Sequence, residues 1–446
     1  MKIFNNIKVK KCICAIMALI LTVAVFTACG ESGDGGQYSE NDVSTEFRND
    51  YATAVDQSKS RIVYDMLDDP YEGVKGNSQP FDTNQYYFNL TKNNGSKYGI
   101  PFTGTIDEDY QQVVLCEKSS CLHIDETCPA HIDLIGGYFT IGDQLYFYSP
   151  SSYEYSTDSD NGAGNRIRLF SVDGGGKELF CEIQGYSQAD GTVITDGKDL
   201  YLTAKNEKDL DIYIIKIDMS TATASVLYEM PARYSLFEYR ICDITADGRQ
   251  LIITARDFNR IEDYSVGVYS FGDNSFEIIK KLPADQYKIP TDKGLVDRYT
   301  IIGNYLYEFE MESGNITRQQ LGKEEKEIIV LDARKLTDNP HHITFSHTYG
   351  DKVVLNCFAG EKHKLSTAEF YVLDTKTLSI VPLDIKAYNS MGIMTLIRVF
   401  SATSDYFVIA TNTSKHSAMA NEMALISKDN FYTNNYMVTP IGTIGY

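Results

Sequence analysis

The chain has 446 residues and a formal net charge of -20. A surface this acidic repels phosphate backbones and anionic lipid head groups, which excludes nucleic acid as an expected partner. Tyrosine (32) and phenylalanine (21) are plentiful and tryptophan is absent, a composition that favours an all-β core.

The N-terminal residues have the layout of an export signal. Three lysines at 8–11 are followed by an apolar run over 12–25 and then by Thr27-Ala28-Cys29-Gly30. A cysteine directly after a small residue resembles the lipobox of bacterial lipoproteins, although Phe26 stands where an aliphatic residue is usual. We therefore predict that residues 1–28 are a lipoprotein signal peptide. Cys29 is then the lipidated N-terminus that anchors the protein to the outer face of the cell membrane. The alternative is an ordinary secretory signal peptide.

Residues 29–80 contain little apolar sequence. Four glycines between Gly30 and Gly36 stand among serine and acidic residues, and Pro70 and Pro80 follow. Such a segment is too polar to bury a core, so we predict a flexible acidic tether that leads into the globular part. The remaining residues, 81–446, are predicted to form one domain.

A tight turn followed by an apolar strand recurs through this domain. One copy is Thr195-Asp196-Gly197-Lys198-Asp199-Leu200-Tyr201-Leu202, and the others share its turn glycine. The recurring positions are Gly142, Gly197, Gly248, Gly303 and Gly350, with Ser404 in a sixth copy. They are separated by about 47 to 55 residues, and a period of that size is typical of repeat folds.

Each repeat also contains a second pair of strands. The first strand of this second pair often ends at an aspartate. These residues are Asp173, Asp218, Asp332 and Asp374. A short acidic side chain at a turn bonds neighbouring backbone amides, so we assign them to hairpin geometry rather than to catalysis.

Four short strands in about 50 residues make one blade of a β-propeller. We predict an all-β propeller of seven blades, with six or eight possible. Residues 81–132 supply one blade, and the last strands near 436–441 join the first blade to close the ring. A pair of β-sandwiches is the alternative fold, but it predicts no constant period.

A cysteine-histidine stretch interrupts the repeat, with the spacing C-x4-C-x-H-x4-C. Its members are Cys116, Cys121, His123 and Cys128. Three thiols and an imidazole are the ligand set of a closed zinc site. Thiols outside the cell also oxidise, so a disulfide between two of these cysteines is an equal alternative. Cys181, Cys242 and Cys357 lie in apolar strands, where we expect small buried side chains.

One known group of proteins combines the same features: a lipobox, an acidic tether, this cysteine element and blades with a glycine turn. The chain resembles the uncharacterised β-propeller lipoproteins of Gram-positive anaerobic bacteria. The resemblance implies anchoring at the cell surface and a propeller fold, and it implies no activity.

No sequence motif of a nucleophilic, metalloprotease or phosphate-binding site occurs in the chain. We therefore expect a noncatalytic lipoprotein that binds a peptide, glycan or protein partner in the cell envelope, with long loops that carry recognition. The alternative is an exported hydrolase or lyase with carboxylates at the propeller channel. Candidate contact residues in the loops are aromatic: Tyr153, Tyr155, Tyr234, Phe237, Tyr239 and Tyr264.

Overall fold

The computed structural model divides the chain into two compact units, Met1–Glu46 and Phe47–Tyr446. The residues that it describes all belong to the second unit. They are 61–65, 80–81, 86–91, 97–103, 111–112, 115–116, 118–122, 128–132, 137–150, 166–173, 176–231, 237–245, 248–257, 264–291, 294–336, 340–359, 369–384, 386–388, 394–403, 405–412, 420–435 and 437–445. The predicted signal peptide, Cys29 and the first half of the predicted tether lie outside the described residues.

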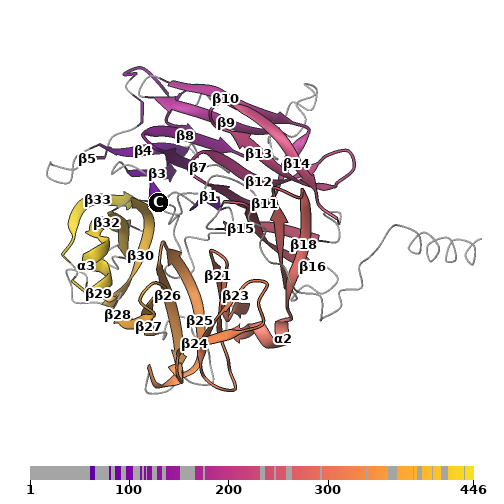
Figure 1. The fold of residues 1–446 in the computed structure, drawn as a ribbon. Helices are drawn as coiled ribbons and strands as arrows, with labels where there is room; N and C mark the ends of the chain where they lie inside the picture. Colours follow the sequence, from indigo (N-terminus) through magenta and orange to yellow (C-terminus); the bar gives the residue numbers. More distant parts are fainter. Residues whose placement is uncertain are drawn as a thin grey trace, which may run out of the picture. The chain divides into compact units, whose positions relative to one another are not determined.

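The second unit is a β-propeller with six regular blades, each an antiparallel sheet whose four strands follow one another in the chain (Figure 1). Blade one consists of β7 (Gly137–Ile141), β8 (Gln144–Ser149), β9 (Arg166–Asp173) and β10 (Gly176–Gln184). Blade two consists of β11 (Tyr186–Thr195), β12 (Asp199–Asn206), β13 (Ile212–Asp218) and β14 (Thr223–Glu229). Blade three consists of β15 (Phe237–Ile244), β16 (Gln250–Asp257), β17 (Tyr264–Ser270) and β18 (Ser275–Leu282).

The remaining three blades repeat this order. Blade four consists of β21 (Tyr299–Ile302), β22 (Tyr305–Phe309), β23 (Ile316–Gln320) and β24 (Lys326–Val330). Blade five consists of β25 (Pro340–Tyr349), β26 (Lys352–Ala359), β27 (Glu369–Asp374) and β28 (Ser379–Leu383). Blade six consists of β30 (Met394–Thr403), β31 (Tyr406–Asn412), β32 (Ala420–Ser427) and β33 (Thr439–Gly445), and β29 (Lys386–Tyr388) pairs with β30.

Short elements connect the blades. The helix α2 (Ala284–Tyr287) and the hairpin of β19 (Lys288–Thr291) and β20 (Gly294–Asp297) lie between blades three and four. The 3-10 helix η2 (Ala333–Leu336) follows β24, and α3 (Lys428–Tyr432) lies between β32 and β33. Among the described residues, no helix is both long enough and apolar enough to cross a bilayer.

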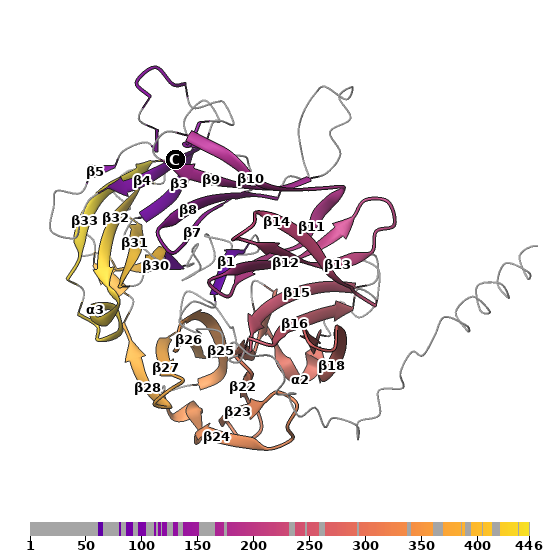
Figure 2. The ribbon, with the colours of Figure 1, turned by 45° about the horizontal axis from the view of Figure 1, so that its top comes forward.

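The first strands of the blades line the middle of the ring. β11 contacts β15, β15 contacts β21, and β21 contacts β25, so these strands form a continuous inner layer. Figure 2 shows fourth strands such as β24 and β33 on the outside. Each blade of a propeller keeps an inner edge at the central channel and an outer edge at the surface, and these edges are short.

A smaller sheet lies between blade six and blade one. It consists of β3 (Tyr86–Thr91), β4 (Lys97–Thr103), β5 (Gln111–Gln112) and β6 (His131–Ile132), and β3 contacts both β7 and β30. This is the segment 81–132 that we predicted as a blade. Strands of two residues cannot offer a hydrophobic face of blade size, so the described ring has six regular blades and one irregular sheet rather than seven blades.

Two strands from the N-terminal side of residue 81 also belong to the propeller. β1 (Arg61–Asp65) pairs with β11 in an antiparallel register, with Ile62 opposite Ile194. β2 (Pro80–Phe81) pairs in parallel with β30. The predicted domain start at residue 81 falls within β2, and β1 lies before it. The predicted closure joined the last strands to the first predicted blade, residues 81–132. In the described residues β33 pairs with β32 and contacts β5, which belongs to that segment.

The recurring glycine turn joins the first and second strands of its blade, as its sequence period implies. All five turn glycines have φ between 56° and 84°, the left-handed region that glycine enters without steric cost. In blade two the turn is held by side chains: Thr195 Oγ1 accepts from the N–H of Gly197 at 3.0 Å, and Asp196 Oδ1 accepts from the N–H of Asp199 at 2.7 Å.

The aspartates at the second hairpins have the predicted turn role in three blades. The carboxylates of Asp173, Asp218 and Asp374 accept from backbone N–H groups two or three residues further along the chain. Asp332 differs, because it leads into η2 and forms an ion pair with Arg334 at 2.8 Å. These acidic side chains are explained by local structure.

The hydrophobic core consists of layers between neighbouring blades. Phe139 and Tyr148 of blade one pack with Val193 and Leu202 of blade two, and equivalent clusters join blades two to three, three to four and four to five. The second strand β12 is buried on both faces, whereas the outer strand β14 is mostly exposed. Burial between sheets explains why the inner strands are continuous apolar runs.

Candidate functional site

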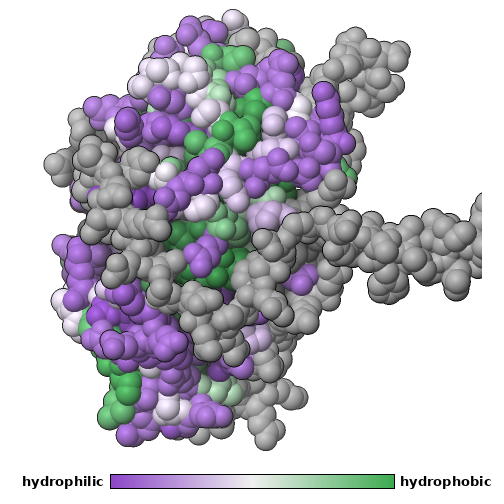
Figure 3. Space-filling model, turned by 45° about the vertical axis from the view of Figure 1, so that its right-hand side comes forward, coloured by the Kyte–Doolittle hydropathy of each residue, from purple (hydrophilic) through white to green (hydrophobic). Residues whose placement is uncertain are grey.

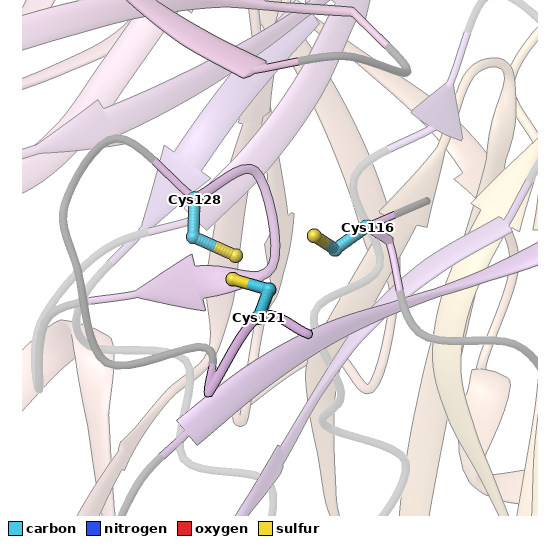
Figure 4. A group of neighbouring side chains, drawn as sticks. All are labelled: Cys116, Cys121 and Cys128. Atoms are coloured by element: carbon cyan, nitrogen blue, oxygen red, sulfur yellow. The ribbon is translucent and has the colours of Figure 1, made fainter. Parts of the chain in front are cut away.

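Three of the four predicted metal-ligand residues come together in the loop between β5 and β6. The sulfur atoms of Cys116, Cys121 and Cys128 all lie within 4.8 Å of one another. Figure 4 shows Cys121 and Cys128 facing each other, with Cys116 directed towards them. His123 lies outside the described residues. We call these three cysteines the cysteine cluster.

Two tight turns place the thiols. The N–H of Cys121 donates to the carbonyl oxygen of Lys118 at 3.1 Å, and the N–H of His131 donates to that of Cys128 at 3.0 Å. Pro129 follows Cys128, and proline favours that position of a turn because its φ is already fixed. The second turn leads directly into β6, which pairs with β4.

The cluster has a small, dry centre. Cys128 is 2% exposed and packs with buried Ala130, while Cys116 and Cys121 are half-buried around them. Burial raises the pKa of the Cys128 thiol to about 12, and the neighbouring thiols of Cys121 and Cys116 add to this rise. The N–H of Ala130, which donates to Cys128, acts in the opposite direction. A nucleophilic cysteine needs a lowered pKa, so Cys128 is not suited to catalysis.

Blade one holds the end of this loop through two side chains. The hydroxyl of Tyr138 on β7 donates to the carbonyl oxygen of Pro129. The ammonium of Lys177 on β10 donates to the carbonyl oxygen of His131, and it lies 4.2 Å from the centre of the Phe147 ring. The cysteine cluster is thus fixed at the junction between the small sheet and blade one.

The other cysteines of the propeller have the predicted structural role. Cys181 on β10 and Cys357 on β26 are buried, and Cys242 lies half-buried at a bulge in β15. None of the three forms a disulfide in the described structure. Burial raises the pKa of the Cys357 thiol to about 12, and the carboxylate of Glu369 adds to the rise.

The six aromatic residues predicted in loops do not form one site in the described structure. Tyr153, Tyr155 and Tyr234 lie outside the described residues, and Phe237 is the first residue of β15. The prediction is wrong for Tyr239, which is buried in β15 and packs edge-to-face on Phe276. Tyr264 begins β17, where the Arg256 guanidinium lies 5.9 Å from its ring centre. Strand alternation places Tyr239 in the core, and a loop assignment overlooked that alternation.

The centre of the ring is a second place where a propeller can carry a site. Here β1 pairs with β11 and contacts β7 and β15, the first strands of three successive blades. Figure 2 shows β1 near the middle of the ring. Val63 of β1 is 2% exposed and packs into the core between blades one and two. Sequence reasoning missed this strand, although the apolar run Ile62-Val63-Tyr64 was a signal for it.

Only two acidic side chains are buried in the described part of the chain, and each is paired with a lysine of its own blade. The Asp199 carboxylate lies 2.6 Å from the Lys216 ammonium, and the Glu308 carboxylate lies 2.9 Å from the Lys326 ammonium. Each lysine offsets the charge of its buried partner, and Asp199 Oδ1 has no hydrogen-bond partner among the described residues.

Comparison with known proteins gives no family. No protein-family model matches the chain, and no curated protein matches it in sequence. Among solved structures, it is similar to a puromycin-hydrolysing peptidase of Mycobacterium tuberculosis, with 11% identity over 88% of this chain and 55% of that one and a TM-score of 0.48. The propeller domain of the Trilobed protease of Pyrococcus furiosus gives 13% identity over 70% and 84% of the two chains and a TM-score of 0.38.

An oligogalacturonate lyase of Vibrio parahaemolyticus gives 10% identity over 80% of this chain and 84% of that one, with a TM-score of 0.37. This chain spans about half the length of the peptidases that it matches, between 48% and 55%. At these identities and TM-scores the similarity carries no argument about substrate or reaction.

Proposed function

We propose that the protein is a lipid-anchored, noncatalytic β-propeller lipoprotein that binds a peptide, glycan or protein partner in the cell envelope. The proposal rests most heavily on the strand β1. This strand pairs with β11 and contacts β7 and β15 at the ring centre. An enzyme with carboxylates at the channel needs that space for its substrate, whereas a binding module that uses its blade loops does not.

The pairing of the acidic side chains supports the same function. Glycoside cleavage by two carboxylates needs them about 5 to 10 Å apart around one bond. The two buried acids of the described part lie in different blades and are bound to lysines, and the turn aspartates bond backbone amides. Glu310 also lies 3.0 Å from the Lys326 ammonium, so Glu308 and Glu310 share one lysine. In the described part of the chain these carboxylates are engaged by lysines or backbone amides.

The surface favours a polar partner. On the face drawn in Figure 3, hydrophilic side chains cover most of the described surface, and hydrophobic ones gather near its middle and in its upper part. Exposed apolar side chains of the outer strands include Leu179 on β10, Val226 on β14 and Ile328 on β24.

The membrane anchor is supported by the sequence at Cys29 and by the resemblance to propeller lipoproteins. Metabolic labelling with a radioactive fatty acid in a Gram-positive host tests it. The full-length protein is expected to take up label and to sediment with membranes, and the Cys29→Ala variant is expected to do neither. Equal labelling of the variant contradicts the anchor.

The binding activity is tested with the mature chain produced without its lipid. Immobilised protein is exposed to a glycan array and to cell-envelope extract, and saturable binding to a glycan, peptide or protein is expected. The same samples are incubated with polysaccharide and peptide substrate mixtures, and the products are measured by mass spectrometry. Turnover of any substrate, or the absence of every saturable partner, contradicts the proposed function.

A further inference from the structure

The cysteine cluster brings three thiols to one point in the loop between β5 and β6, next to the contacts that Tyr138 and Lys177 make with the end of that loop. We propose that Cys116, Cys121 and Cys128 bind one zinc ion, which fixes the loop between β5 and β6 at the junction of the small sheet with blade one. This inference does not depend on the proposed function, because it concerns the stability of the ring. His123 lies outside the described residues and is not part of it.

The distances between the sulfur atoms favour a metal. Around a tetrahedral zinc ion with Zn–S bonds of about 2.3 Å, sulfur atoms lie about 3.8 Å apart. All three sulfur atoms of the cluster are within 4.8 Å of one another, so a small inward movement brings them to three of the four corners of such a site. A disulfide joins two sulfur atoms at about 2.05 Å and leaves the third without a function.

The surroundings suit a zinc thiolate site. The N–H of Ala130 donates a hydrogen bond to the sulfur of Cys128. Hydrogen bonds from groups around the ligand residues commonly orient and stabilise metal-bound ligands in this way. Three thiolates this close repel one another in a half-buried site, and a divalent cation removes most of that repulsion. Thiolates are soft donors, which favours zinc over calcium or magnesium.

The local fold explains why a metal is needed here. β5 and β6 have two residues each, and the buried residues in the described part of the loop are Cys128, Pro129 and Ala130. A cluster this small buries too little apolar surface to order the loop, and small structural units in this position commonly use a metal or a disulfide. The small sheet contacts both blade six and blade one through β3, so the ion stabilises the ring where the chain closes it.

The test measures metal and thiols in the same preparation. The mature chain is purified from zinc-supplemented culture, and its metal content is measured by inductively coupled plasma mass spectrometry. We expect about one zinc per chain. Cys116→Ser, Cys121→Ser and Cys128→Ser are each expected to lower zinc affinity by more than about 100-fold. Cys181→Ser is the matched control, because it removes a buried thiol of blade one outside the cluster and is expected to retain zinc.

Two measurements on the unsubstituted protein keep the proposal testable if a variant fails to fold. Replacement of zinc by Co²⁺ is expected to give the intense near-ultraviolet thiolate-to-metal band and the visible bands of a tetrahedral site. Metal-stripped, denatured protein that was never reduced is expected to show all three cluster thiols free. A preparation without zinc overturns the proposal. The proposal is also overturned if all three variants retain zinc, or if any cluster thiol of the metal-stripped, denatured protein reacts only after reduction.

Discussion

The ammonium of Lys177 on the outer strand of blade one donates to the backbone carbonyl oxygen of His131, and it also lies over the Phe147 ring. This buried contact ties the end of the cysteine loop to a regular blade.

Substitution of Lys177 by methionine is expected to destabilise the protein by about 1–3 kcal/mol. The variant keeps the aliphatic stem but loses the cation-π contact and leaves the His131 carbonyl oxygen without this donor. Urea unfolding followed by circular dichroism measures the change. Lys198→Met, at an exposed turn position, is the control and is expected to change stability by less than about 0.5 kcal/mol. Equal stability of the two variants contradicts the role of Lys177.

The second prediction concerns Val63, whose side chain places β1 in the propeller core. Val63→Ala removes two buried methyl groups and is expected to cost about 1–2.5 kcal/mol. Val226→Ala on the exposed strand β14 deletes the same atoms from a side chain that is 51% exposed, and it is expected to cost little. Thermal unfolding with limited proteolysis near residue 61 compares the two. If Val63→Ala leaves the unfolding temperature and the proteolysis near residue 61 unchanged, β1 is not part of the folded ring.

The third prediction compares two ion pairs of equal length and different burial. Asp199–Lys216 and Asp351–Lys376 both have a nitrogen-to-oxygen distance of 2.6 Å, but the acidic side chains are 3% and 46% exposed. Asp199→Asn leaves a partly buried lysine with a weaker partner and is expected to cost about 2–3 kcal/mol. Asp351→Asn is expected to cost less than about 1 kcal/mol. Denaturant unfolding of both variants tests the difference, and equal losses contradict it.

The fourth prediction is a dependence of stability on acid pH. Partial burial tends to raise the pKa of Asp374, but the Lys352 ammonium and the N–H groups of Thr377 and Lys376 outweigh it and lower that pKa to about 2. Because the folded pKa is below the unfolded value of about 3.9, the stabilisation is complete above that value. It is lost as the pH falls towards 2.

Asp374→Asn tests this prediction, because the variant loses the titrating carboxylate but keeps an oxygen that can accept from the turn amides. Its unfolding free energy is expected to decline less steeply than that of the parent between about pH 4 and pH 2. The difference is expected to stay below about 2 kcal/mol because the carboxylate is close to solvent. Parallel slopes of the two proteins over this pH range contradict the assigned cause.

The fifth prediction concerns thiol reactivity. Cys357 is 1% exposed with a pKa raised to about 12, so it is expected to resist alkylation by iodoacetamide at pH 8 in the native protein. It is expected to react once the protein is unfolded. Peptide mapping by mass spectrometry follows the site, with half-buried Cys242 as the comparison within the same sample. Modification of Cys357 at the rate of Cys242 in native protein is inconsistent with its burial.

Much of the fold could be predicted because each repeat contains turn residues whose effect depends only on their near neighbours in the sequence. A turn glycine such as Gly197 needs a left-handed backbone, and an aspartate such as Asp218 bonds the amides that follow it. Both signals act within a few residues and recur once in a blade. The period therefore indicates a propeller even though no single strand does.

The parts that sequence reasoning missed depend on distant pairing. The sequence around Val63 does not show that this residue is buried. Its burial depends on β11 and two neighbouring blades, which are distant in the chain. Tyr239 could be assigned to a loop because its partner Phe276 lies a whole hairpin away. The cysteine spacing indicated one site, and only the folded loop shows that three thiols meet there.

The position of β1 and β2 has a consequence for how the ring is made. Synthesis proceeds from the N-terminus, so both strands exist long before their partners β11 and β30. Blades can form one after another from neighbouring hairpins, but β2 has no partner until the last blade has been produced. Pairing across so much intervening chain is slow because loop closure costs entropy. Closure of the ring is therefore expected to be the final folding step, and a nascent chain that stalls before blade six leaves an unpaired strand exposed to other chains.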